Sequence, residues 1–154
     1  MEDAAAPRTG LHLPLSDAVQ KEAMDREDAS SRRCLVVDDS DVIRRVARRI
    51  LEDMRFEVAE AEDGIQALEA CRAGMPDLIV LDWLLPGMGG CDFLVQLRPL
   101  IEGRRPRVIY CTTEYDETAA AIARAAGADD ILLKPFDRQS LVASMAAAGI
   151  LPAA

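Results

Sequence analysis

From about residue 33 to about residue 148, short apolar runs alternate with longer segments in which apolar residues recur at a helical spacing. The runs are partly β-branched and contain few polar residues. Such a run suits a strand buried on both faces, and buried strands that alternate with helices are typical of a parallel sheet. Five strand–helix units with short connections predict an α/β fold, a doubly wound (βα)5 sandwich of three layers.

Strands and helices can be assigned along this whole stretch. The predicted strands are Arg33–Asp38, Phe56–Glu60, Asp77–Asp82, Arg107–Cys111 and Ile131–Lys134. The predicted helices are Asp41–Met54, Gly64–Ala73, a segment after Gly90 that reaches about Leu100, Glu117–Ala126 and Arg138–Ala148. The first helix is expected to turn one apolar face to the sheet, comprising Val42, Ile43, Val46, Ala47, Ile50, Leu51 and Met54.

Length and charge narrow the possible functions. The chain has 154 residues, enough for one domain with a substantial core. Its net charge of -9 argues against a nucleic-acid binder, since phosphate contacts need a basic surface. No apolar run approaches the roughly 20 residues of a membrane helix, and the acidic N-terminus does not resemble a signal peptide. We therefore expect a cytoplasmic protein. Its four cysteines lack metal-binding spacing and are expected to be reduced: Cys34, Cys71, Cys91 and Cys111.

Residues 1–31 differ in composition from the remainder of the chain. They contain seven acidic and three basic residues and no sustained apolar pattern, which predicts a disordered extension. A short helix that is capped by Ser16 and runs through Met24 is an alternative for part of this segment. The folded domain is expected over residues 32–150, with a tail at 151–154. Only one closing helix fits after the last strand, so we expect no separate output domain.

Three acidic residues stand at the ends of two predicted strands. Asp38 and Asp39 close the first strand, and Asp82 closes the third. Sites in open parallel sheets lie at the carboxyl ends of the strands, so the three carboxylates are expected to converge there. Carboxylates this close repel one another unless a cation lies among them, and a cluster of oxygen ligands favours Mg²⁺. A bound divalent cation is therefore expected at these strand ends.

Two further polar residues end strands on the same side. Thr112 follows the fourth strand, and Lys134 ends the fifth. A lysine and a cation beside a carboxylate would stabilise the charge that develops when the carboxylate attacks a phosphoryl group, and a threonine hydroxyl can donate to a phosphoryl oxygen. Taken singly, an Asp pair can cap a helix, a threonine can end a turn, and Lys-Pro can mark a bend. Their joint occurrence at successive strand ends favours aspartyl-phosphate chemistry.

Five short stretches carry a resemblance to a known family. They are Val36-Val-Asp-Asp-Ser40, Asp82-Trp-Leu-Leu-Pro-Gly87, Cys111-Thr-Thr113, Gly127-Ala-Asp-Asp130 and Lys134-Pro-Phe136. With them, residues 32–150 resemble the receiver domain of bacterial two-component response regulators, and within that family they look most like the single-domain, CheY-like regulators. The resemblance implies a flavodoxin-like parallel sheet with strand order 2-1-3-4-5.

The resemblance also implies roles for the acids. Asp82 is the implied phosphoacceptor and lies beside the cation as one of its ligands. Asp39 is an implied direct Mg²⁺ ligand, whereas Asp38 is expected to act mainly through a metal-bound water. The backbone carbonyl of Leu84 is another implied ligand.

Other positions are expected to control the switch. Thr112 is the implied switch hydroxyl and Lys134 the implied partner of the phosphoryl group, with a cis bond between Lys134 and Pro135. The family usually has an aromatic residue where this chain has Ile131, and a β-branched aliphatic cannot report the switch by ring rotation. Thr113 replaces a small residue, and its bulk is expected to narrow access to the site.

Leu84 and Glu114 occupy positions near the expected path of the water that would hydrolyse the phosphoryl group. Leucine offers no hydrogen bond to orient that water. We therefore expect slower dephosphorylation than with a polar residue at position 84.

Together these features predict a single-domain response regulator in a two-component phosphorelay, with chemotaxis-type signalling as one possible pathway. Its donor is expected to be a histidine kinase or a histidine phosphotransfer protein, and its output a protein contact through the face from Thr112 to Lys134. Beyond its own phosphorylation and dephosphorylation, no enzyme activity is expected. An adaptor that keeps the fold without phosphorylation is an alternative. A small-molecule phosphatase is disfavoured, because no general acid follows Asp82 and the chain has no length for a cap.

The first predicted helix is rich in arginine. Its arginines, with one just beyond it, are Arg44, Arg45, Arg48, Arg49 and Arg55. One explanation is a solvated polar face beside the apolar one. The other is a docking surface for an acidic partner, because a local basic patch on an acidic protein can steer association.

Overall fold

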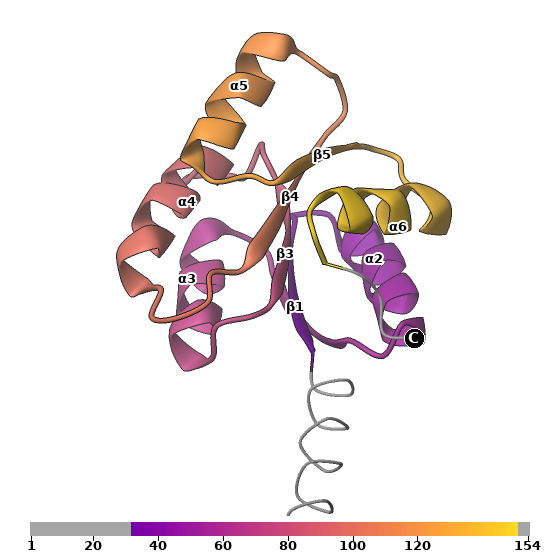
Figure 1. Ribbon diagram of the computed structural model, residues 1–154, viewed down its shortest axis with the longest axis horizontal. Coiled ribbons are helices and arrows are strands. Elements are labelled where there is room, and N and C mark those ends of the chain that lie inside the picture. The colour runs from indigo at the N-terminus through magenta and orange to yellow at the C-terminus, as the bar shows by residue number, and fades with distance from the viewer. Residues whose placement is uncertain (1–31, 151–154) are drawn as a thin grey trace, which may run out of the picture.

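Residues 32–150, the part of the chain that the computed structural model describes, form a five-stranded parallel sheet with helices on both faces (Figure 1). The strand order is β2-β1-β3-β4-β5, as expected. The strands are β1 (Arg33–Val37), β2 (Glu57–Ala61), β3 (Leu78–Asp82), β4 (Arg107–Thr112) and β5 (Asp130–Leu133). The helices are α2 (Asp41–Asp53), α3 (Gly64–Ala73), α4 (Gly90–Leu97), α5 (Glu117–Ala126) and α6 (Arg138–Ala147). The expectations for residues 1–31 and 151–154 fall outside the described residues.

The third predicted helix is shorter than expected. It was predicted to reach about Leu100, but α4 ends at Leu97 and the chain continues as a 3-10 turn, η2 (Arg98–Leu100). Pro99 lies in this turn and has no N–H to donate to a preceding carbonyl, so a regular α-helix does not continue through it. The other predicted boundaries agree with the observed elements to within one residue.

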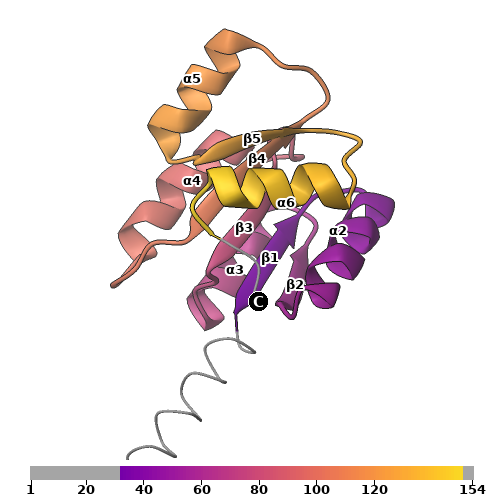
Figure 2. The ribbon, with the colours of Figure 1, turned by 45° about the vertical axis from the view of Figure 1, so that its right-hand side comes forward.

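Helices on the two faces of the sheet enclose two separate cores. α3, α4 and α5 cover one face, and α2 and α6 cover the other (Figures 1 and 2). Alternate side chains of β1 supply both cores: Leu35 and Val37 pack on the α3–α5 side, whereas Cys34 and Val36 pack on the α2–α6 side. Successive side chains of a strand point to opposite faces, and this is why the central strands are apolar throughout.

The face of α2 that packs on the sheet differs from the predicted apolar face. Val42 and Val46 were assigned to that face, but they are 61% and 40% exposed, whereas Arg44 is 7% exposed. Arg44 precedes Ala47 by three residues, and residues at this spacing lie on the same side of a helix. The assignment of Val42 and Val46 to the face that packs on the sheet was therefore wrong. An apolar pattern alone does not show that Arg44 belongs to this face, because the burial of an arginine depends on nearby acids that compensate its charge.

All four cysteines are free, as expected for reduced residues. Cys34, Cys71 and Cys111 are buried. Burial raises the pKa of the Cys71 thiol to about 11, so this thiol stays protonated at neutral pH. Within residues 32–150, no helix has the length and apolar character needed to cross a membrane.

Candidate functional site

The strand ends bring the predicted acids together. β1 and β3 are neighbours in the sheet, and Val37 of β1 pairs with Leu81 of β3. The next residues are Asp38, directly after β1, and Asp82, the last residue of β3, so both lie at the carboxyl edge of the sheet. Carboxylate oxygens of Asp38, Asp39 and Asp82, called here the acidic cluster, all lie within 4.8 Å of one another.

The acidic cluster has the donor set of a hard divalent cation. All three candidate ligand atoms are carboxylate oxygens, and Asp38 and Asp82 are buried. Such oxygens suit Mg²⁺ better than softer metals, which prefer nitrogen or sulfur. Asp39 is exposed, so the cluster opens to solvent on one side, and Mg²⁺ usually keeps several of its waters. The residues therefore fit the cation that the sequence predicts.

Lys134 neutralises part of this negative charge. Its Nζ lies 2.9 Å from Oδ2 of Asp38 and 3.2 Å from Oδ1 of Asp82. Its backbone N–H donates to the carbonyl of Thr112 (2.8 Å), which ties it to the end of β4. The peptide bond between Lys134 and Pro135 is cis, as the resemblance implied. One ammonium group therefore bridges the two buried acids.

Burial and neighbouring charges alter the proton affinities of these groups. Burial raises the pKa of Asp82 and the charge of Asp38 raises it further, while Lys134 opposes both effects. Burial alone would lower the pKa of Lys134, but hydrogen bonding to Asp38 and the charges of both acids raise it above its ordinary value. Lys134 is therefore an ammonium ion at neutral pH.

Asp38 is held through its backbone as well as its side chain. Its N–H donates to the carbonyl of Ala61 (3.1 Å), and its Oδ1 accepts from the N–H of Ser40 (2.9 Å). Its carbonyl accepts from Nη1 of Arg44 (2.6 Å), a buried contact that the sequence pattern did not predict. The sequence carries no clear signal for this contact, because the burial of Arg44 depends on how α2 packs on the sheet and on acids distant in the sequence.

Thr112 lies at the end of β4, but its hydroxyl bonds within its own loop. The hydroxyl donates to the carbonyl of Glu114 (3.1 Å) and accepts from the Glu114 N–H (3.4 Å). Thr113 and Glu114 are exposed. Within residues 32–150, no hydrogen bond joins the Thr112 hydroxyl to the acidic cluster.

Leu84 and Ile131 border the site in different ways. The N–H of Leu84 donates to Oδ1 of Asp82 (3.2 Å), while its side chain is 75% exposed. That the backbone carbonyl of Leu84 binds the cation stays a prediction. Ile131 pairs with Tyr110 between β5 and β4 and packs against the core on the α3–α5 side. Tyr110 in turn contacts Trp83, the residue that follows Asp82, and their ring centroids lie 4.3 Å apart. A chain of contacts therefore leads from Ile131 through Tyr110 to Trp83.

Comparisons with known proteins agree with this geometry. The family model for the response regulator receiver domain matches residues 34–146. The chain is 38% identical over 117 residues to the phosphate regulon transcriptional regulatory protein PhoB of Escherichia coli, covering 76% of this chain and 51% of PhoB. It is 37% identical over 120 residues to the DNA-binding response regulator MtrA of Mycobacterium tuberculosis, covering 78% of this chain and 51% of MtrA. The chain thus spans about half the length of these curated relatives.

Solved structures share the fold. The chemotaxis response regulator CheY4 of Vibrio cholerae superposes with a TM-score of 0.72 at 30% identity, covering 77% of this chain and 98% of that chain. A CheY-like receiver domain protein of Methanospirillum hungatei gives a TM-score of 0.69 at 27% identity, covering 76% and 92%. Because the family model covers most of the sequence and these relatives have the same architecture, the chain belongs to the family of response regulator receiver domains.

Proposed function

We propose that the protein is a response regulator whose Asp82 accepts a phosphoryl group from a histidine kinase or a histidine phosphotransfer protein. The observation that carries the proposal is the position of Asp82. It is buried, belongs to the acidic cluster and has the ammonium of Lys134 at 3.2 Å from its Oδ1. A carboxylate between a cation site and a lysine is arranged for attack on phosphorus.

In the proposed step, an oxygen of Asp82 forms a bond to phosphorus while the bond from phosphorus to the donor's imidazole nitrogen breaks. The electron pair of the broken bond stays with the imidazole, which leaves as a neutral ring when its other nitrogen carries a proton. Oδ1 of Asp82 already accepts from the Leu84 N–H, so we assign the attack to Oδ2. Lys134 pairs with the charge on the transferred oxygens. A bound Mg²⁺ would supply further charge neutralisation.

Phosphorylation is proposed to alter the face from Thr112 to Lys134. A phosphoryl oxygen would offer the Thr112 hydroxyl a charged acceptor in place of Glu114. Exposed apolar side chains for a protein contact lie along this face, at Tyr115, Ile122 and Leu133. Shifting a two-state surface from 1:99 to 99:1 takes about 5.5 kcal/mol. Two or three hydrogen bonds to charged groups, at about 1.5–3 kcal/mol each, can supply this.

We infer protein partners rather than nucleic acid. PhoB and MtrA are named as transcriptional or DNA-binding regulators, whereas the overall charge of this chain favours contact with proteins. Its net charge of -9 disfavours contact with a phosphate backbone. We further propose that the protein acts in the cytoplasm and turns over no separate small-molecule substrate.

The test is to incubate the protein with Mg²⁺ and acetyl phosphate, or with a phosphorylated histidine kinase, and to measure intact mass. Wild type should gain one phosphoryl group, and Asp82→Asn should gain none. Asp92→Asn, which changes an exposed carboxylate in α4, is the matched control and should react as wild type does. Failure of wild type to form an adduct with either donor would contradict the proposal and favour the adaptor function.

A further inference from the structure

Arg44 is a buried cation beside the acidic cluster. Among residues 32–150, the buried polar and charged side chains are Asp38, Arg44, Asp82 and Ser144. Two of these are site acids, and Ser144 donates a hydrogen bond to Asp130 (2.7 Å). Arg44 is therefore the one buried base of the described residues. A buried charge is costly unless partners compensate it, so its contacts are informative.

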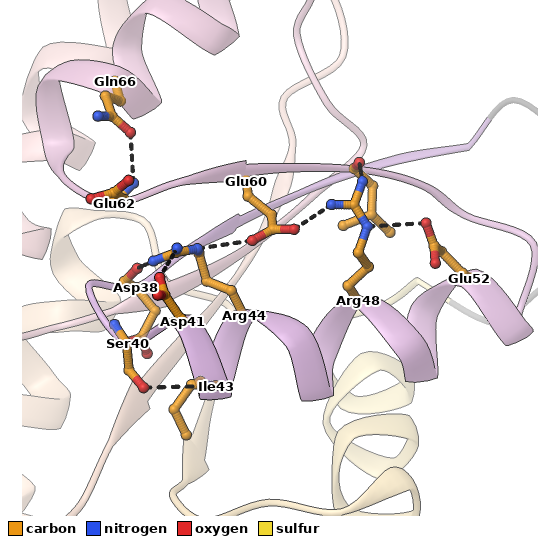
Figure 3. Close-up of polar contacts among 11 residues, drawn as sticks. Asp38, Ser40, Asp41, Ile43, Arg44, Arg48, Glu52, Glu60, Glu62 and Gln66 are labelled. Atoms are coloured by element: carbon orange, nitrogen blue, oxygen red, sulfur yellow. Dashed lines mark hydrogen bonds and ion pairs between the residues drawn. The ribbon is translucent and has the colours of Figure 1, made fainter.

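Three acceptors surround the guanidinium of Arg44 (Figure 3). Nη1 donates to the backbone carbonyl of Asp38 at 2.6 Å, and Nε donates to Oε1 of Glu60 at 2.9 Å. Nη2 pairs with Oδ1 of Asp41. These partners come from the end of β1, from β2 and from the first turn of α2. One planar group with fixed donor directions therefore ties three elements together next to the site.

The carbonyl of Asp38 belongs to the peptide that joins Asp38 to Asp39. A peptide unit is planar, so fixing the direction of its carbonyl also fixes how the chain continues to Asp39. Both residues contribute oxygens to the acidic cluster. Through the backbone, Arg44 thus constrains the angle between two of the three candidate cation ligands.

The positive charge of Arg44 is balanced by its own partners. Burial alone would lower the pKa of Arg44, but hydrogen bonds and charge from Glu60 and Asp41 raise it. An unbalanced cation here would repel a divalent cation in the acidic cluster. Because Glu60 and Asp41 offset the charge, the contact with the Asp38 carbonyl affects the cluster mainly through geometry.

We propose that Arg44 is a positioning residue for the cation site: it holds the Asp38–Asp39 peptide so that both carboxylates reach one divalent cation. This inference rests on the cation site of the proposed function. Groups that orient metal ligands typically change metal affinity by about 10–100-fold when they are removed. Loss of Arg44 is therefore expected to weaken Mg²⁺ binding, although removal of a nearby positive charge would by itself strengthen it.

Arg48 provides a matched control on the same helix (Figure 3). It pairs with the same Glu60 and also with Glu52, and its Nη2 donates to the carbonyl of Val58 at 3.0 Å. Its contacts therefore resemble those of Arg44 in number and kind, but none of them is to Asp38. A purely structural role of the arginines would make the two residues equivalent in a cation-binding assay.

The experiment compares Arg44→Met with Arg48→Met, which both keep an apolar stem. Mg²⁺ alone is titrated into each protein, and binding is followed by calorimetry and by the fluorescence of Trp83, the only tryptophan. We expect the Mg²⁺ Kd of Arg44→Met to rise about tenfold, and that of Arg48→Met to stay within about twofold of wild type. Unchanged affinity in Arg44→Met, tighter binding, or an equal loss in both variants would overturn the proposal.

Two further comparisons complete the test. If Arg44→Met does not fold, Arg44→Lys keeps the charge but cannot reach all three acceptors, and its Kd should still rise at least about threefold. Affinity equal to wild type in Arg44→Lys would show that charge and not geometry matters, and would also overturn the proposal. Mg²⁺ binding by wild type without an Asp82 adduct would remove the phosphoacceptor function while leaving the role of Arg44 intact.

Discussion

Nζ of Lys134 lies 2.9 Å from Oδ2 of Asp38 and 3.2 Å from Oδ1 of Asp82, so one ammonium group contacts both buried acids. The same two residues contribute oxygens to the acidic cluster that fits a divalent cation. Lys134 and a bound cation would therefore compete for the same negative charge. For phosphoryl transfer their effects should instead add, because both neutralise the oxygens of the transferred group.

Replacing Lys134 by Met is accordingly expected to tighten Mg²⁺ binding and to slow phosphorylation of Asp82. Two unit charges about 4 Å apart interact by about 4 kcal/mol at an effective dielectric constant of about 20, and solvent screening reduces that value. We expect the Mg²⁺ Kd to fall about tenfold and adduct formation from acetyl phosphate to slow at least about tenfold. Trp83 fluorescence and intact mass measure the two quantities. Arg138→Met, which removes an exposed cation from α6, should change neither, and weaker Mg²⁺ binding in Lys134→Met would contradict the argument.

Mg²⁺ should also stabilise the fold through the acidic cluster. A ligand at about 100 times its Kd adds about 2.7 kcal/mol to the free energy of unfolding when it binds only the folded state. For a domain of this size, we expect the Tm to rise by about 10 °C. Asp39→Asn should abolish the rise because it removes an exposed ligand without disturbing the buried acids. Differential scanning calorimetry with and without Mg²⁺ measures this, and a rise preserved in Asp39→Asn would exclude Asp39 as a ligand.

The fold and the acidic cluster were predictable because each depends on local pattern plus one topological rule. Apolar runs identify buried parallel strands, and the strand ends then place Asp38, Asp82 and Lys134 at one edge. The role of Arg44 was not predictable in this way. Its partner Glu60 lies 16 residues away in β2, and only the packing of α2 on the sheet shows that the guanidinium is buried. From a helical pattern alone, an arginine is expected to be exposed, whether or not distant acids compensate its charge.

Leu84→Asn is expected to speed hydrolysis of the phosphoryl group on Asp82. The Leu84 side chain is exposed and only its backbone N–H contacts Asp82, so the substitution should leave the site geometry unchanged. An amide can orient the attacking water, and general positioning effects of this kind are worth about tenfold or more. Loss of the adduct after removal of the donor, followed by intact mass, gives the rate. Val95→Asn, an exposed position in α4, is the control, and equal or slower decay in Leu84→Asn would refute the expectation.

Glu60 should contribute pH-dependent stability. Burial alone would raise the pKa of Glu60, but hydrogen bonds from Arg48 and Arg44 lower it below its ordinary value. A carboxyl group with a depressed folded-state pKa stabilises the fold above its unfolded pKa of about 4.3, and this contribution is lost as the pH falls through the folded-state pKa. Because Glu60 is partly exposed and solvent screens its ion pairs, Glu60→Gln should lower the free energy of unfolding by about 0.5–1 kcal/mol near neutral pH and by much less near pH 3.

Urea unfolding at several pH values measures the effect of Glu60→Gln. Glu69→Gln changes an exposed carboxylate in α3 and should show a much smaller difference from wild type at every pH. A loss of stability in Glu60→Gln that is the same at neutral and acidic pH would mean that the charge of Glu60 is not the cause.

The arginines of α2 divide into two groups with different expected roles. Arg44 and Arg48 are used in ion pairs within the domain, whereas Arg45 and Arg49 are exposed. Neither the solvated face nor the docking surface predicted for the whole arginine set therefore holds for all its members, because Arg44 is buried. Within α2, Arg45 and Arg49 are the pair available to an acidic partner, and Arg55, just beyond the helix, is exposed as well. Reversal of both charges, Arg45→Glu with Arg49→Glu, is expected to slow phosphotransfer from a histidine kinase about tenfold through weaker electrostatic steering.

Acetyl phosphate supplies the internal control for this charge reversal. A small donor needs no protein interface, so its reaction with Asp82 should proceed at the wild-type rate in the double variant. The difference between the two donors should also shrink at high ionic strength, because salt screens charges on an exposed surface. Equal slowing with both donors would place the effect at the phosphorylation site itself. Unchanged transfer from the kinase would leave Arg45 and Arg49 as residues of a solvated face.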